Sequence, residues 1–213
     1  RHATSKISSS KDLEAIASLG FRGEALASMS AVSKMRIMTQ ERGSLTGTIL
    51  HVEGSRVISS EEYAGPEGTR ISIREIFYNT PARLKFLKTS QTESRRVYEV
   101  MEQMALAYPE IHFKLTQDER IKLDLPPHSS LKERTLALFG RNLYEKLYPL
   151  ENLPPLGECS VSGLISSPDF SSNDRGRLYI FVNQRAIKDK TINAAISAAY
   201  KEFLHGKFPC AIL

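Results

Sequence analysis

The chain has 213 residues, of which 41% are hydrophobic and 25% are charged; this balance fits one large or two modest folded domains and argues against disorder. No apolar run approaches the roughly eighteen residues that a membrane-spanning helix needs, and no secretory signal is recognisable. The net charge of +5 leaves two interpretations open, a surface that attracts polyanions and an ordinary solvated surface. Cys159 and Cys210 lie far apart without metal-ligand spacing, so we expect two buried thiols in a cytoplasmic protein.

The first part of the chain predicts two short helices followed by an antiparallel sheet. One helix is expected to end at Gly20 and the next to start near Gly23. From residue 33 to residue 74, short runs of alternating apolar and polar residues are broken by turn-forming residues at 53–55 and 65–68. This alternation is typical of antiparallel strands.

A long helix and a hairpin are expected next. The helix spans about 92–108, and the apolar stripe that should face a core consists of Val97, Val100, Met101, Met104 and Tyr108. Two strands, near 111–115 and 121–123, can share that core. Two prolines and several small polar residues follow Leu125 and resist both helix and sheet. We therefore expect two domains, 1–125 and 126–213.

The remainder predicts an α+β domain. A helix is expected at Leu131–Phe139, a strand near 160–165, an apolar strand at Leu178–Val182 that turns at the next two residues, and a helix over 191–204. From the strand near 160–165 to the strand-like run that ends the chain, the order is β-β-α-β, which is typical of an α+β fold. The chain opens with Arg1 and closes on a strand-like apolar run, so we expect a segment of a longer protein.

Residues 20–26 (GFRGEAL) point most directly to a ligand. If Gly23 opens the second helix, the amides of Gly23, Glu24, Ala25 and Leu26 have no acceptor within the helix. Such amides, together with the helix dipole, form a site for an anion such as phosphate. A tight corner between two helices, with glycines that permit close packing, is the alternative.

Two shorter features are compatible with a nucleotide. Thr4, Ser5 and Lys6 can fold over a triphosphate, or they can belong to a frayed terminus. Thr69 begins a strand, where its hydroxyl can bind a base or an ordered water, although a glycine–threonine pair is common in proteins. Neither feature identifies a nucleotide site by itself.

Two basic segments complete the candidates. Residues 77–87 (FYNTPARLKFL) can pack against a nucleotide site, contact nucleic acid, or simply lead into a helix. Arg185, Lys188 and Lys190 follow an apolar strand and can contact backbone phosphates or protect a sheet edge. No complete catalytic arrangement and no Walker-type phosphate loop is present in the sequence.

Residues 1–7 (RHATSKI), 20–26 and 77–87 together resemble, in order and spacing, the MutL, MLH and PMS family of DNA mismatch-repair proteins within the GHKL ATPase superfamily. Residues 181–185 (FVNQR) resemble a strand and turn of that family's second domain. The resemblance implies an α+β chain: the C-terminal part of an α/β-sandwich ATPase domain, followed by a domain similar to the second domain of gyrase B.

The resemblance also implies ligands. In that family, ATP is bound by a lid, by the turn and helix start that receive the phosphates, and by a threonine near the adenine. The implied ATP-binding residues of this sequence are Thr4, Ser5, Lys6, Gly20, Arg22, Gly23, Glu24, Ala25, Leu26 and Thr69. The implied DNA-binding residues are Arg185, Lys188 and Lys190. The family's catalytic glutamate, its Mg²⁺-binding asparagine and its adenine-reading motif precede the lid and are absent from this sequence, so we expect no catalytic residue and no metal ligand here.

The function so implied is DNA mismatch repair, in which binding of ATP and Mg²⁺ and slow hydrolysis gate N-terminal dimerisation, DNA binding and partner recruitment. Expected partners are DNA, a mismatch-recognition protein, downstream repair enzymes and a second MutL-type chain, with no membrane. The location would be cytoplasmic in bacteria and nuclear in eukaryotes, and this chain alone would be inactive. Two alternatives stay open: another GHKL ATPase, and a non-enzymatic DNA-binding scaffold.

Overall fold

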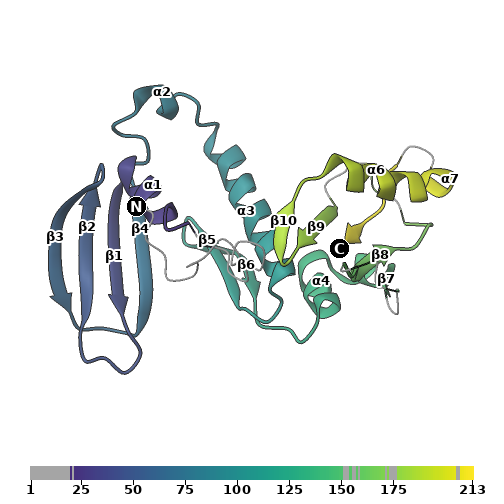
Figure 1. The fold of residues 1–213 in the computed structure, drawn as a ribbon, viewed down its shortest axis with the longest axis horizontal. Coiled ribbons are helices and arrows are strands. Elements are labelled where there is room, and N and C mark those ends of the chain that lie inside the picture. The colour runs from purple at the N-terminus through teal and green to yellow at the C-terminus, as the bar shows by residue number, and fades with distance from the viewer. Residues whose placement is uncertain are drawn as a thin grey trace. The chain divides into compact units, whose positions relative to one another are not determined.

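The computed structural model describes residues 20, 22–150, 154, 157, 159–170, 172, 177–204 and 207–213 (Figure 1). The chain divides into two compact units, Arg1–Thr89 and Ser90–Leu213. The helix expected before Gly20 lies outside the described residues. Within the described part, no helix has both the length and the apolar character needed to cross a membrane.

The first unit contains the predicted antiparallel sheet, which has four strands. Its strands are β1 (Lys34–Gln40), β2 (Gly47–Glu53), β3 (Arg56–Tyr63) and β4 (Gly68–Arg74), in the order β3-β2-β1-β4 (Figure 1). Gly54 and Ser55 join β2 to β3 with φ angles of 52° and 71°. Two left-handed residues in a two-residue connection favour the right-handed twist of a hairpin. The turn predicted at 53–55 is therefore confirmed.

One face of this sheet is apolar. Met35 on β1 and Val52 on β2 are register partners and are buried, with exposed fractions of 4% and 6%. On the same face, Ile71 and Ile73 of β4 remain exposed. Helix α1 (Ala25–Ala31) packs against β1 and β2. The alternation read in the sequence thus separates a core face from a polar face.

The second unit opens with α3 (Ser90–Ala107) and the hairpin β5 (Phe113–Gln117) and β6 (Arg120–Leu125). The predicted shared core forms around Ala105, Leu123 and Leu125. The predicted stripe is wrong in part, because Val97 and Val100 are exposed. The side of α3 that faces the hairpin instead carries Tyr98, Met101 and Ala105, spaced at i, i+3 and i+7.

A five-stranded sheet follows. Its strands are β7 (Leu147–Leu150), β8 (Gly163–Ser166), β9 (Leu178–Val182), β10 (Arg185–Ile187) and β11 (Ala211–Ile212), in the order β10-β9-β11-β8-β7. The predicted helix at Leu131–Phe139 is α4, which Gly140 ends. A short helix, α5 (Arg141–Tyr144), comes next. Strands β7 and β10 were not predicted, while the α+β class is confirmed.

The long helix predicted over 191–204 consists of two helices. These are α6 (Lys190–Ala199) and α7 (Lys201–Leu204), and Tyr200 lies between them with φ −97° and ψ 0°. The Tyr200 hydroxyl donates a hydrogen bond to the carbonyl of Ser166, at 2.6 Å. This hydrogen bond anchors the Tyr200 side chain to β8 at the point where α6 ends and α7 begins.

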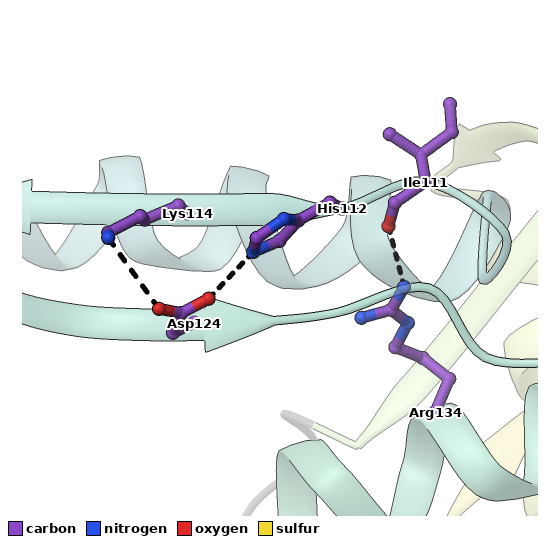
Figure 2. Close-up of polar contacts among 5 residues, drawn as sticks. All are labelled: Ile111, His112, Lys114, Asp124 and Arg134. Carbon is purple, nitrogen blue, oxygen red and sulfur yellow. Dashed lines mark hydrogen bonds and ion pairs between the residues drawn. The ribbon is translucent and has the colours of Figure 1, made fainter.

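A buried arginine joins α4 to the turn that precedes the hairpin. Arg134 is 0% exposed, and its Nη2 donates a hydrogen bond to the carbonyl of Pro109. The same nitrogen donates a second hydrogen bond to the carbonyl of Ile111 (Figure 2). Leu106 of α3 also belongs to the core of the five-stranded sheet. The two compact units divide after Thr89, so α3 and the hairpin belong to the same unit as the five-stranded sheet. The expected domain boundary between 125 and 126 remains a prediction.

The expectation for the cysteines was half right. Both thiols are free, but Cys159 is exposed and only Cys210 is buried. Burial raises the pKa of the Cys210 thiol to about 12, so this thiol stays protonated at neutral pH. Cys210 is a core residue and not a nucleophile.

Candidate functional site

The start of helix α1 is the candidate phosphate site. Gly23 has φ 62°, in the left-handed region, and therefore lies outside the helix. Glu24 is the N-cap residue and Ala25 the first helical residue, so the helix begins two residues later than predicted. Ser28 makes the first intrahelical bond, from its amide to the carbonyl of Glu24 at 2.8 Å. The exposed Ala25 and Leu26 thus present first-turn amides for which the helix has no acceptor.

The remaining predicted residues near α1 divide into two groups. Gly20 and Arg22 are described, exposed and close in sequence to the helix start. The residues expected in the ATP lid, Thr4, Ser5 and Lys6, lie outside the described residues. Their relation to the helix start remains a prediction.

The C-terminal end of α1 is held by residues from the 77–87 segment. The Asn79 side chain donates from Nδ2 to the carbonyl of Ala31 at 2.9 Å. The Phe77 amide donates to the carbonyl of Val32 at 2.6 Å. Pro81 then opens the short helix α2 (Pro81–Leu84). Of the three interpretations of this segment, leading into a helix agrees with these contacts, while packing against a nucleotide site and contact with nucleic acid remain predictions.

Thr69 lies elsewhere on the sheet. Its hydroxyl and that of Thr39 are 2.9 Å apart across β4 and β1. Thr69 also lines a shallow hollow of about 130 Å³ with Met38, Tyr63 and Arg70 among its walls. Five residues separate Thr69 from Arg74, roughly 17 Å along a strand. The Ala31 end of α1 is bound to the loop after Arg74, so Thr69 and this end of α1 lie at opposite ends of the sheet.

The predicted DNA-binding residues share one connection in the second unit. Arg185 begins β10, which is an edge strand, and Lys190 is the first residue of α6. Lys188 and Lys190 are exposed. The carboxylate of Asp189, which lies between them, caps α6 by accepting a hydrogen bond from the Ile192 amide at 2.8 Å. The three bases thus lie on one short connection between β9 and α6, and both phosphate contact and edge protection fit this position.

The described residues contain no group of three histidine, cysteine, aspartate or glutamate side chains that could hold a metal ion. Partial burial raises the pKa of the Glu102 carboxyl, which accepts a hydrogen bond from the Tyr179 hydroxyl. Glu102 and Tyr179 both belong to the second unit, whereas α1 belongs to the first. This pair is part of the packing between α3 and β9.

Comparison with known proteins identifies the family. The DNA mismatch repair protein MutL of Geotalea daltonii is 41% identical over 100% of this chain, and that of Syntrophobacter fumaroxidans is 40% identical over 100%. The chain belongs to the MutL family. Residues 135–213 match the family model described as DNA mismatch repair protein, C-terminal domain. The chain spans 35% and 32% of the lengths of the two MutL relatives.

Solved structures agree with the MutL assignment. The Aquifex aeolicus MutL ATPase domain complexed with ADP matches 96% of this chain and 75% of its own length, with 29% identity and a TM-score of 0.68. The N-terminal domain of a DNA repair protein matches 94% of this chain and 64% of its own length, with a TM-score of 0.77 and 23% identity, which shows the fold alone. The implied α+β fold of the GHKL type is confirmed.

Proposed function

We propose that the full-length protein is a mismatch-repair ATPase in which ATP binding and slow hydrolysis gate the association of two N-terminal regions. One observation carries this proposal: nearly the whole chain matches a MutL ATPase domain that was solved with ADP. A slow ATPase can act as a switch because one of its conformations binds ATP better than the other does. The protein would work in the cytoplasm of a bacterium or in a eukaryotic nucleus.

The proposed phosphate site is the start of α1. First-turn amides at Ala25 and Leu26 can donate to phosphate oxygens, and Gly23 allows the chain to turn immediately before them. The lid would be supplied by Thr4, Ser5 and Lys6, while Thr69 would contact the adenine side. Gly20 and Arg22 would shape the turn, while Glu24 would belong with Gly23, Ala25 and Leu26 to the helix start that receives the phosphates.

The same proposal assigns Mg²⁺ and catalysis to residues outside this chain. When bound, the metal ion would neutralise charge on the nucleotide phosphates. The chain's own residues would bind and orient the phosphates, and the chain alone would not hydrolyse ATP.

DNA is the proposed second ligand. Arg185, Lys188 and Lys190 would contact backbone phosphates without reading sequence. A second MutL-type chain, a mismatch-recognition protein and downstream repair enzymes would be the protein partners. The domain boundary would follow Leu125.

ATP turnover and nucleotide affinity of the full-length protein, measured beside this chain, test the proposal. Turnover in the full-length protein and none in the chain is the expected result. Absence of nucleotide binding in both, with DNA binding retained, would instead identify a non-enzymatic DNA-binding scaffold.

A further inference from the structure

The polar face of the four-stranded sheet carries a concentration of arginines. Residues directly opposite each other in an antiparallel pair point to the same face. The register places Lys34 opposite Arg74 and Glu53, and Arg36 opposite Ser72 and His51. Farther along, Met38 is opposite Arg70, and Arg56 is opposite Glu53. We call this surface the arginine face; its basic residues are Lys34, Arg36, Arg56, Arg70 and Arg74.

The charges on this face are poorly balanced. The register places two carboxylates, Glu53 and Glu61, on it among five bases. Lys34 is paired with Glu75 at 2.8 Å. Arg36, Arg70 and Arg74 are exposed, and within the part of the chain that the structure describes they form no ion pair or side-chain hydrogen bond. A guanidinium stays charged at every accessible pH, so these are permanent unneutralised cations.

The stability of the sheet does not explain this arrangement. Lys34 and Arg74 are direct cross-strand partners, and like charges in that position are destabilising. A face selected only for solvation would alternate acids and bases across the strands. A hollow of about 280 Å³ lies at this point, and its walls include Lys34, Arg36, His51 and Arg74.

We propose that the arginine face binds the phosphate backbone of duplex DNA, as a contact surface separate from Arg185, Lys188 and Lys190. Arginine forks match phosphate geometry, and phosphate contacts require no apolar anchor. A protein partner would instead be expected to need a buried aromatic or aliphatic anchor. The cross-strand rows through Lys34 and Arg36 contain none.

The arginine face was not recognised from the sequence, although a signal was present. Arg70 and Arg74 flank the alternating run of β4, and Arg36 occupies a polar position of β1. Alternation shows that each points away from the apolar face of its own strand. Only the pairing of β1 with β4 brings them together.

The test measures binding of the full-length protein to a random-sequence duplex as a function of salt concentration, without nucleotide and with a non-hydrolysable ATP analogue. Neutralising one phosphate contact changes the slope of log K against log salt by about 0.9. The variant Arg36→Gln/Arg74→Gln should therefore bind more weakly, with a slope shallower by about 1 to 2. The matched control is Arg95→Gln/Arg96→Gln, which removes two exposed helix arginines that have local ion pairs, at Glu99 and Glu93, and should keep the parent slope.

The outcomes separate this inference from the proposed function. An unchanged slope in Arg36→Gln/Arg74→Gln, with a shallower slope in Lys188→Gln/Lys190→Gln, would overturn the arginine face as a DNA surface and leave the other cluster standing. If Arg36→Gln/Arg74→Gln kept the parent slope but no longer bound an acidic protein partner, the arginine face would be a protein interface and not a DNA surface. The salt dependence measured without nucleotide does not depend on ATP turnover. A failure of the proposed ATPase function would therefore leave the comparison of these slopes intact.

Discussion

The two sheets of this protein are built in different ways. In the first unit, each strand pairs with a neighbour in sequence or closes the sheet beside β1, and Met35 and Val52 form a small buried centre. In the second unit, β11 lies between β9 and β8, parallel to the first and antiparallel to the second. Among the described residues its core is larger, and Leu143, Leu147 and Ile212 are at most 2% exposed. Local pairing thus suffices for the sheet beneath the candidate phosphate site, whereas the second sheet depends on long-range packing.

The largest expected effect concerns Gly23, in the unit with the smaller core. A β-branched residue is strained at φ 62°, so Gly23→Val should abolish nucleotide binding by the full-length protein in a titration with fluorescent ATP. Gly43→Val is the matched control, because Gly43 has φ 78° and no atom lies within 4 Å of an added Cβ. Normal affinity in Gly23→Val would remove the assignment of phosphates to the start of α1.

The contrast between the cores predicts unequal costs of truncation. Leu147→Ala should destabilise the second unit by about 4 kcal/mol, and Met35→Ala the first by about 2 kcal/mol, because partly exposed neighbours can close around the smaller side chain. Hydrogen exchange of each unit, followed by mass spectrometry, measures both opening free energies. Equal costs would show that the two cores are equally well packed.

A smaller effect is expected at the anchor of α1. Asn79→Ala removes the hydrogen bond to the Ala31 carbonyl and should cost about 1 kcal/mol, with a several-fold loss of nucleotide affinity. Asn142→Ala, at an exposed position on α5 of the second unit, should change neither quantity. An Asn79→Ala protein with unaltered ATP affinity would show that this contact does not position the helix start.

The smallest effect is a pH dependence in the β5–β6 hairpin. The hydrogen bond from His112, at 2.7 Å, and the charge of Lys114 lower the pKa of Asp124 below its ordinary 3.8 (Figure 2). A lowered pKa in the folded state stabilises the fold above the unfolded pKa, and this stabilisation is lost as pH falls below about 4 through the folded pKa. The difference in Tm between the parent and Asp124→Asn should therefore shrink between pH 6 and pH 3, and a constant difference would contradict the assignment.

The sequence by itself determined the local elements. Alternation and turn residues predicted the antiparallel sheet between residues 33 and 74, and the helical pattern located α4 at Leu131–Phe139. The sequence also contained the family motifs, although Gly23 precedes α1 and does not open it. These features depend on neighbours within a few residues, which is why they can be read from one chain.

Tertiary structure alone decided the rest. It turned Val97 and Val100 outward by packing Tyr98, Met101 and Ala105 on the hairpin, and it inserted β11 between β8 and β9. It also gathered Arg36 of β1 with Arg70 and Arg74 of β4 on one face, although these two strands lie far apart in the sequence. Which of several apolar or charged faces meets a partner depends on contacts between segments distant in sequence, and periodicity within one segment does not specify that choice.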